Sequence, residues 1–428
     1  MVVHISNSPV TIVKRNSNMM TSSNIVIHNM KIRTWDNQYI DLPLPDTYGA
    51  QKNIVALPGL IDPHVHFRIP GTEEKEDWKT GSKAAIAGGY TSVFDMPNNT
   101  PPCINKTTLQ EKTTLIERML DEVHSPLAFK LWIGATKENI EKIPELKKDI
   151  IGIKVFMGAS TGTLLMDNPE MQKALFKMAG EHNIVIGTHA EDEEELKKGK
   201  EKYPETTDVH DHSKIRDRNA AIKAVSHAIT LAKKYHTKLY LLHVSTAEEV
   251  ALIRQAKNDG ITVYAEVTPH HLFLSEKDYD TLGTKAQMNP PLRTEEDQKA
   301  LWQEILDGTI DTIGTDHAPH TLEQKALPYG QAPSGVPGIE TALSLMIDAY
   351  NKGTITLERI VDIMHTNSTK IFSYIPKETW IIVDLDLIKT VRDQDMYTKC
   401  GWSPFAGREL KGWPLGVVIN NIYYPSHT

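Results

Sequence analysis

Eight short apolar runs, each rich in residues that favour β-strands, follow one another between residues 54 and 315. These runs cover residues 54–60, 90–96, 127–133, 150–157, 184–187, 239–243, 261–267 and 310–315. The intervening windows 106–121, 171–181, 215–235 and 294–306 have helical periodicity and charged outer faces. Strand and helix alternation repeated eight times predicts an α/β fold, a (β/α)8 TIM barrel, whose functional groups lie at the carboxyl ends of the strands.

Strand-like, turn-rich sequence lies on both sides of the predicted barrel. It covers residues 24–40 before the barrel, and residues 380–387 and 413–424 after it. Because the two ends can pair, we expect a small β-sandwich domain formed by residues 25–58 and 371–428, with the barrel at 59–370. We expect residues 1–24 to be a flexible N-terminal tail, although the absence of acidic residues from the first 35 positions also fits an organelle-targeting segment.

The composition excludes several classes of function. With 428 residues, of which 40% are hydrophobic, the chain can bury a full core. A net charge of -8 provides no basic face for nucleic acid or for a membrane surface, and no apolar stretch reaches the ~20 residues of a bilayer span. The two cysteines, Cys103 and Cys400, form no CxxC pair. We therefore expect a soluble, cytoplasmic protein in which nitrogen and oxygen atoms hold any metal.

Potential metal ligands stand at the ends of five apolar runs. His64 and His66 have a two-residue spacing, which directs both imidazoles to one side of a strand end. Taken alone, such a pair is as readily a hydrogen-bonded core group as a metal site. Further candidates end the later runs: Lys154, His189, His243 and Asp316. Because barrel strands end at one mouth, these side chains are expected to converge there.

Lys154 is unusual for the interior of an apolar strand. An ammonium group is costly to bury and tends to lose its proton. A neutral lysine can react with carbon dioxide, and the resulting carbamate can bridge two metal ions that lie about 3.5–4 Å apart. For a lysine in isolation, an ordinary ion pair is the simpler interpretation. With four histidines and an aspartate at neighbouring strand ends, we favour the bridging ligand.

These candidate ligands predict a binuclear centre with zinc as the expected metal, although manganese or cobalt would suit the same donors. Two divalent cations, the carbamate, Asp316 and a bridging hydroxide leave a small net positive charge, which suits an anionic substrate. His270 and His271 end the seventh run, but the ligand set is already full, so they are expected to support the ligands from behind or to be structural. His210, His212, His227 and His236 are expected to lie in loops or outer helices. The acidic run 191–195 is expected to be a solvated helix start.

The motifs around these residues resemble those of the dihydroorotases, in the amidohydrolase superfamily, along nearly the whole chain. The matching segments are 58–71, 95–99, 288–293, 316–320 and 401–405. The resemblance implies two metal ions held by His64, His66, carboxylated Lys154, His189, His243 and Asp316. It implies that Asp316 is also the catalytic proton carrier, and that the substrate is bound by Arg68, Asn98, Asn289 and His320. Many long-chain members of the family have aspartate at position 154, so the chain resembles the lysine-bearing branch.

The resemblance also implies a reaction, the reversible hydrolysis of the ring amide of dihydroorotate to N-carbamoyl-L-aspartate in pyrimidine biosynthesis. A hydroxide bridging the metals would attack the ring carbonyl, and Asp316 would carry its proton to the leaving nitrogen. A planar guanidinium at Arg68 suits the substrate carboxylate. The turn 335–338 is expected to close the pocket or to offer backbone groups to it.

Two other functions share parts of this pattern. An allantoinase or hydantoinase would open an uncharged ring, and would leave Arg68 without a partner. A catalytically silent homologue, acting as a structural partner of aspartate transcarbamoylase, would be expected to lack metal ligands, whereas here the set is complete. We expect a homodimer, and an association with aspartate transcarbamoylase stays open.

Overall fold

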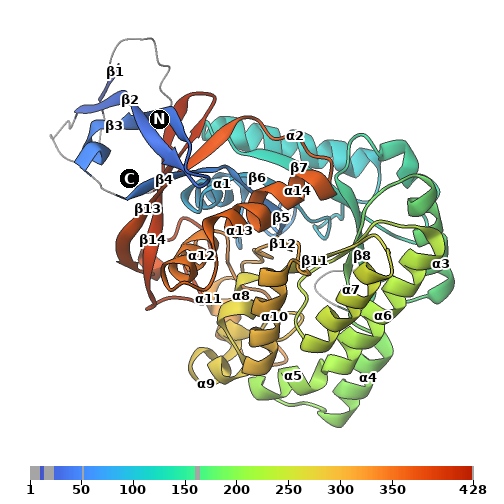
Figure 1. Ribbon diagram of the computed structural model, residues 1–428. Helices are drawn as coiled ribbons and strands as arrows, with labels where there is room; N and C mark the ends of the chain where they lie inside the picture. Colours follow the sequence, from blue (N-terminus) through green and yellow to red (C-terminus); the bar gives the residue numbers. More distant parts are fainter. Residues whose placement is uncertain (1–9, 14–23, 51–52, 160–163, 427–428) are drawn as a thin grey trace.

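The computed structural model describes residues 10–13, 24–50, 53–159 and 164–426, and contains a barrel and a second, smaller sheet (Figure 1). Eight parallel strands form the barrel in chain order: β5 (Leu60–Val65), β6 (Tyr90–Asp95), β7 (Ala128–Gly134), β8 (Gly152–Phe156), β9 (Ile186–His189), β10 (Leu239–Leu241), β11 (Val263–Val267) and β12 (Thr312–Ile313). Val65 bridges to His317, and the backbone N–H of His66 donates to the His317 carbonyl at 2.9 Å, which closes the ring. The predicted TIM barrel is confirmed.

The first barrel strand begins later than the apolar pattern predicts. The run 54–60 forms β4 (Ile54–Pro58), which pairs with the C-terminal part of the chain, and is not a barrel strand. The barrel strand β5 contains Asp62 and Pro63, and these two residues interrupt its apolar pattern. Asp62 is fully buried because its carboxylate accepts hydrogen bonds from the backbone N–H and the hydroxyl of Thr315, across the closing seam.

The barrel strands are covered by helices on the outside. The outer helices are α1 (Trp78–Ala87), α2 (Lys106–Glu122), α3 (Pro169–Glu181), α6 (Arg218–Tyr235), α7 (Ala247–Asn258), α10 (Glu295–Asp307), α12 (Ala342–Asn351), α13 (Leu357–Val361) and α14 (Asn367–Ile371). Capping boxes begin α2 at Asn105, α7 at Thr246 and α10 at Thr294, which satisfies N–H groups that have no partner inside the helix. The helices expected at 106–121, 171–181, 215–235 and 294–306 are confirmed as α2, α3, α6 and α10.

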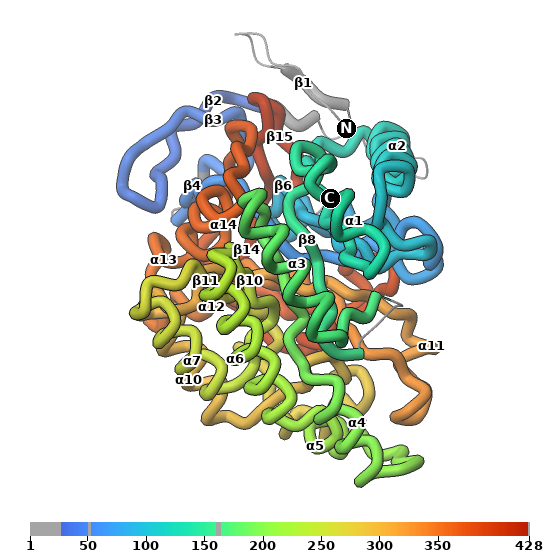
Figure 2. Tube along the Cα trace, turned by 90° about the vertical axis from the view of Figure 1, so that its right-hand side faces the viewer, coloured from blue at the N-terminus to red at the C-terminus, as the bar shows by residue number. Residues whose placement is uncertain are grey.

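Shorter helices occupy the loops that follow the carboxyl ends of the strands. They are α4 (Glu193–Lys202), α5 (His212–Ile215), α8 (Pro269–Phe273), α9 (Tyr279–Leu282) and α11 (Leu322–Lys325). The second sheet and the pair α4 and α5 lie at opposite ends of the molecule in both views (Figures 1 and 2). In the described part of the chain, no helix combines the length and apolarity needed to cross a membrane.

The second sheet joins the two ends of the chain. Its strands are β1 (Val10–Val13), β2 (Asn24–Thr34), β3 (Tyr39–Pro45), β4, β13 (Thr379–Thr390), β14 (Glu409–Ile419) and β15 (Ile422–Pro425). The N-terminal strand β4 pairs antiparallel with the C-terminal strand β13, which confirms the small β domain built from both termini. Within the predicted tail 1–24, Val10–Val13 pairs with β2, while residues 1–9 and 14–23 lie outside the described residues. The exact domain boundaries stay predictions.

Aromatic side chains fill the barrel interior one layer below the mouth. Phe372, which follows α14, has its ring edge-on to those of Phe94, Trp132 and Tyr240, at centroid distances of 5.3, 5.5 and 5.0 Å. We call these residues the aromatic floor. A Cβ at Gly152 would lie 2.5 Å from the Trp132 ring, so the strand next to Trp132 needs a glycine there. The aromatic floor therefore fills the barrel below the pocket, and the Tyr240 hydroxyl donates from it to the Glu266 carboxylate at 2.9 Å.

Candidate metal centre

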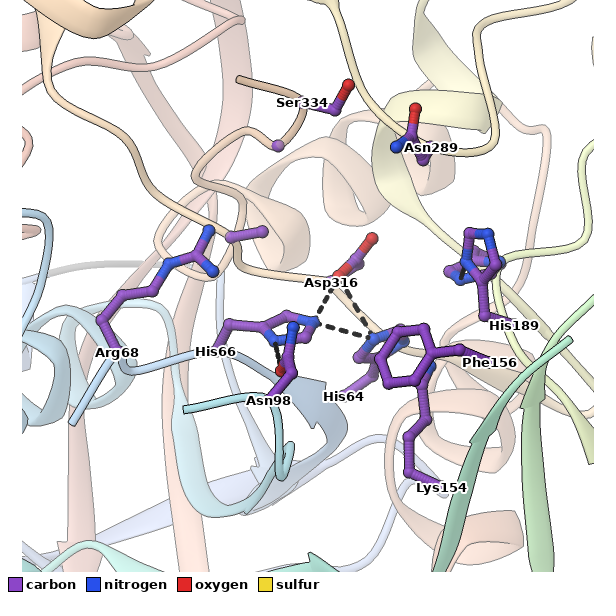
Figure 3. A pocket seen from close by; sticks show the side chains of 13 residues that line it. His64, His66, Arg68, Asn98, Lys154, Phe156, His189, Asn289, Asp316 and Ser334 are labelled. Atoms are coloured by element: carbon purple, nitrogen blue, oxygen red, sulfur yellow. Dashed lines mark hydrogen bonds and ion pairs between the residues drawn. The ribbon is translucent and has the colours of Figure 1, made fainter. Parts of the chain in front are cut away.

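The predicted site residues meet in one pocket at the mouth of the barrel (Figure 3). About 370 Å³ of space that protein atoms do not fill lies in this pocket, part of it open to solvent. Its walls include most of the predicted set, namely His64, His66, Arg68, Asn98, Lys154, His189, His243, Asn289 and Asp316. The remaining predicted residue, His320, is fully buried behind Arg68, with its Nε2 atom 3.2 Å from Nη2 of the guanidinium. Phe156, Ala318, Ser334 and Gly335 complete the wall.

Three potential metal ligands converge at the centre of this pocket. Oδ1 of Asp316 lies 3.2 Å from Nε2 of His64 and 3.1 Å from Nε2 of His66, and the two imidazole nitrogens are 3.3 Å apart. Ligands at 2.0–2.1 Å from a tetrahedral zinc ion are separated by about 3.3 Å. The three buried side chains therefore have the spacing of donors around one ion.

Neighbouring polar groups orient the two histidines. Nδ1 of His64 lies 2.8 Å from Oε1 of Glu266, and Nδ1 of His66 lies 2.8 Å from Oδ1 of Asn98. With one ring nitrogen engaged in this way, the other points into the pocket as a metal ligand requires. Glu266 lies on β11 and is fully buried. Sequence reasoning missed Glu266, although it is a charged residue inside an apolar strand, which is the signal that singled out Lys154.

A second group of nitrogen donors stands beside the first. Nδ1 of His189 lies 3.0 Å from Nε2 of His243, and both rings are buried. The other nitrogen of His243, Nδ1, is buried without a hydrogen-bond partner among the described residues. A buried polar atom of this kind needs a partner, and a metal ion would supply one.

Glu191 fixes the orientation of His189. Its carboxylate lies 2.8 Å from Nε2 of His189 and forms a buried ion pair with Arg216. Burial would raise the pKa of Glu191, but Arg216 and His189 hold it well below its ordinary value. The prediction that the whole run 191–195 is solvated is therefore wrong for Glu191, because it lies two residues beyond His189 and reaches the same interior side. Asp192 does begin helix α4, where its side chain accepts from the backbone N–H of Glu195.

Lys154 has the environment that favours a neutral amine. Its side chain is 1% exposed, and no hydrogen bond or ion pair joins Nζ to another described residue. Nζ lies 4.6 Å from the centroid of the Phe156 ring. Burial lowers the pKa of Lys154 to about 7. The amine can therefore react with carbon dioxide near neutral pH, which fits its predicted role as a bridging ligand.

The imidazole rings are suited to remain neutral. Burial lowers the pKa of His66 to about 3, and it also lowers the pKa values of His189 and His243. Metal ligands must offer an unprotonated nitrogen. Together with the ligand spacing, the unpartnered His243 atom and the lowered pKa of Lys154, this makes the described residues fit divalent cations.

Three pocket residues adopt a left-handed backbone conformation. The φ angles of Arg68, His243 and Asp316 are 63°, 38° and 45°. For residues other than glycine this conformation costs on the order of 1–3 kcal/mol, and it persists where the surrounding structure enforces it. The strain directs each of these side chains into the pocket from the point where its strand has just ended.

Arg68 places an unpaired positive charge beside the ligand group. Its Nε donates to the Pro319 carbonyl at 3.2 Å, and no carboxylate of the described residues lies within ion-pair distance of its guanidinium. Burial lowers the pKa of Arg68 to about 10, so the group is still charged at neutral pH. In Figure 3 the guanidinium lies at the side of the pocket opposite His189. A buried cation of this kind calls for an anion from outside the chain.

The loop after the last barrel strand supplies another part of the pocket wall. Gly335, in the predicted turn 335–338, lines the pocket with a φ of 135°, and a Cβ there would lie 2.5 Å from the Ala318 carbonyl oxygen. His271, expected to support the ligands from behind or to be structural, lies on α8 with Nε2 3.2 Å from the Pro290 carbonyl, and neither it nor His270 lines the pocket.

Comparison with known proteins identifies relatives of the same kind. The Amidohydrolase family model matches residues 55–374. A dihydroorotase of Pyrococcus furiosus is 37% identical over 379 residues, which covers 86% of this chain and 81% of that protein. The multifunctional protein CAD of Squalus acanthias is 34% identical over 376 residues, which is 87% of this chain but only 15% of the length of that protein.

Solved structures share the fold. An L-hydantoinase (dihydropyrimidinase) from Arthrobacter aurescens superposes with a TM-score of 0.80 at 25% identity, over 96% of this chain and 93% of that one. The match covers both the barrel and the sheet formed by the two ends of the chain. The chain therefore belongs to the amidohydrolase family, is related in sequence to the dihydroorotases, and is a cyclic amide hydrolase.

Proposed function

We propose that the chain is a dihydroorotase, which reversibly hydrolyses the ring amide of (S)-dihydroorotate to N-carbamoyl-L-aspartate in pyrimidine biosynthesis. The observation that carries this proposal is Arg68, a buried guanidinium in the pocket wall with no carboxylate partner among the described residues. Dihydroorotate presents a carboxylate, whereas the rings of hydantoin and dihydropyrimidine substrates need none. The relatives named dihydroorotase, at 35–37% identity, support the same choice.

Six residues would hold two divalent cations, for which zinc is our choice given the nitrogen and oxygen donors. They are His64, His66, carboxylated Lys154, His189, His243 and Asp316. Such ions would polarise the ring carbonyl and make a water molecule nucleophilic near neutral pH. Glu266 and Glu191 would hold His64 and His189 in the required orientation.

The chain itself would bind and orient the ring. Arg68 would clamp the substrate carboxylate through two parallel hydrogen bonds, a geometry that a planar guanidinium favours. His320 lies against Arg68, while Asn98 and Asn289 line the pocket and offer amide groups to the ring. Clamping one end of the ring fixes the distance between its amide carbonyl and the ligand group, which lowers the entropic part of the barrier.

Asp316 would move the proton. Burial would raise the pKa of its carboxyl group, but His64 and His66 hold that pKa well below its ordinary value. The group is therefore ionised at neutral pH and can accept a proton from the attacking water. In Figure 3 one carboxylate oxygen faces the two histidines and the other points into the open part of the pocket. From there it would deliver the proton to the leaving ring nitrogen, and the same steps run backwards would close the ring.

The test is ring opening of L-dihydroorotate, allantoin and dihydrouracil by zinc-loaded and chelator-stripped protein, with metal content measured on the same samples. We expect metal-dependent turnover of dihydroorotate alone. Turnover of only an uncharged ring would replace the proposal with the hydantoinase function. No turnover with two metals bound would favour the silent structural partner.

Three further assignments accompany this function. We propose that the protein acts in the cytoplasm, that it forms a homodimer, and that an association with aspartate transcarbamoylase is possible for it. Light scattering on the purified protein and co-sedimentation with aspartate transcarbamoylase test the last two assignments directly.

A further inference from the structure

Lys325 is a buried lysine outside the metal centre. It ends helix α11, its side chain is 1% exposed, and it does not line the pocket. Its ammonium donates to three backbone carbonyls, those of Gln287 at 2.9 Å, Pro333 at 3.0 Å and Gly335 at 3.1 Å. Within the described residues it forms no ion pair with a carboxylate. Buried lysines are rare unless they are paired, so this arrangement needs an explanation.

The three carbonyls belong to two separate segments of the pocket wall. Gln287 stands two residues before Asn289, while Pro333 and Gly335 flank Ser334, and Asn289, Ser334 and Gly335 all line the pocket. The Gln287 carbonyl also accepts from the backbone N–H of Gly335 at 2.9 Å. Lys325 therefore stands at the junction that joins the Asn289 segment to the loop 333–335.

The side chain of Gln287 strengthens the same junction. Its Nε2 donates to the Ala332 carbonyl at 3.0 Å and lies 3.1 Å from the hydroxyl of Ser334. The side chains of Gln287 and Lys325 thus both hold the loop 333–335 in place, the first through a neutral amide and the second through its ammonium group. A substitution at either residue removes one set of hydrogen bonds and keeps the other.

Lys325 acts on the same region of the wall as Arg68. Burial, and then the charge of Arg68, lower the pKa of Lys325 to about 7, so its ammonium form predominates below that pH. The carbonyls of Pro333 and Gly335 bond to Lys325, and the Ser334 carbonyl lies 3.0 Å from Nε2 of His320. Carbonyl oxygens that faced the pocket would repel a carboxylate, whereas here each of the three is engaged by a side-chain nitrogen. The wall near Arg68 therefore has positive potential when Lys325 is protonated, which favours an anionic ligand. A bound anion would in turn favour that protonated form.

We propose that Lys325 is a positioning residue that selects for a ring carrying a carboxylate, because it ties the two recognition segments together and makes their wall electropositive. This inference rests on the proposed function, since it presupposes an anionic ring as substrate. At an effective permittivity of about 20, one charge about 10 Å from an anion changes its affinity on the order of tenfold.

The experiment uses four variants of the zinc-loaded full chain. Lys325→Gln keeps a hydrogen-bond donor and removes the charge, Lys325→Met removes both, and Gln287→Met loosens the loop while keeping the ammonium. Lys177→Gln, which removes an exposed lysine on α3, is the matched control. For each we would measure kcat and KM for dihydroorotate, inhibition constants for orotate and uracil, and the unfolding midpoint.

We expect Lys325→Gln to raise KM for dihydroorotate and the inhibition constant of orotate about tenfold, with kcat within about threefold of wild type. Uracil, which has no carboxylate, should bind as before. Gln287→Met should raise KM less, because the charge remains, and Lys177→Gln should match wild type. If Lys325→Met does not fold, Lys325→Gln and Gln287→Met decide the question.

A folded Lys325→Gln protein with unchanged KM and an unchanged ratio of orotate to uracil binding would overturn the inference. A lower unfolding midpoint together with unchanged KM would show that Lys325 serves only the fold, and would overturn it equally. Wild-type turnover is the separate test of the proposed function. Absence of dihydroorotate hydrolysis in wild type overturns that function and this inference with it, whereas unchanged KM in Lys325→Gln beside an active wild type overturns only the role of Lys325.

Discussion

The mouth and the aromatic floor of the barrel are built from the same strands and have opposite character. On the floor, the ring of Phe372 packs edge to face against those of Phe94, Trp132 and Tyr240. At the mouth, three residues have left-handed backbone. Among the described residues, Nδ1 of His243 has no hydrogen-bond partner there, and the Arg68 guanidinium has no carboxylate within ion-pair distance. Packing that stabilises the fold therefore lies below, and the groups that can react lie above, within a few ångströms along each strand.

Asp316→Asn should produce the largest effect, and only on activity. Asparagine cannot accept the proton, and it is a poorer metal ligand, so kcat should fall on the order of 10⁴-fold. The unfolding free energy of the metal-free protein should change by less than about 1 kcal/mol. Steady-state kinetics and denaturant titration measure the two quantities. A large loss of stability with activity retained would show that Asp316 stabilises the fold and is not needed for catalysis.

Phe372→Ala should produce the opposite pattern. Removing a ring that contacts three others leaves a cavity, and we expect a loss of about 3–5 kcal/mol in unfolding free energy. The kcat of the folded, zinc-loaded protein should stay within about twofold of wild type. Urea unfolding and turnover below the unfolding transition test this. Equal losses of activity and stability would show that floor and mouth are not separable.

Arg68→Met should affect binding more than chemistry. Loss of a bidentate, buried contact with the carboxylate should raise KM for dihydroorotate about 100-fold, with a smaller change in kcat. Arg118→Met, which removes an exposed arginine on α2, is the control for general effects of the substitution. Unchanged turnover in Arg68→Met would mean that the substrate has no carboxylate at this place.

Zinc uptake should depend on pH through Lys154. Its lowered pKa of about 7 means that the amine is protonated below that pH and neutral above it. Only the neutral form reacts with carbon dioxide, so uptake at a fixed partial pressure of carbon dioxide should rise about tenfold per pH unit up to pH ~7 and then level off. Zinc content after a fixed time, from about pH 5.5 to 8.5, measures this. Lys154→Met should show no such rise, and a flat wild-type profile would argue against carboxylation.

Much of the mouth could be predicted because strand geometry is periodic. The two-residue spacing of His64 and His66 fixes their shared direction on any strand, and Asp316 follows a run whose end must meet the same mouth. Their convergence in the structure confirms that geometry, while their roles in catalysis stay proposals.

The residues that sequence reasoning missed depend on neighbours that are distant in the chain. Glu266 reaches His64 across 202 residues of sequence, and nothing near Glu266 indicates that partner. Glu191 was obscured by the exposed acids that follow it. Lys325 bonds only to backbone carbonyls through its ammonium, and backbone partners have no sequence signature at all. The start of β5 was missed because its buried Asp62 breaks the apolar pattern on which strand prediction rests.

The seam where the barrel closes has a consequence for the order of assembly. Asp62 and Thr315, which bond across it, are 253 residues apart in sequence, and His66 bonds to His317 beside them. During synthesis on the ribosome, His64 and His66 cannot contact Asp316 until the last barrel strand has emerged and docked. A bound ion would therefore stabilise the closed barrel, because an ion that needs ligands from both sides of the seam binds the closed ring more tightly than any partly folded form of the chain.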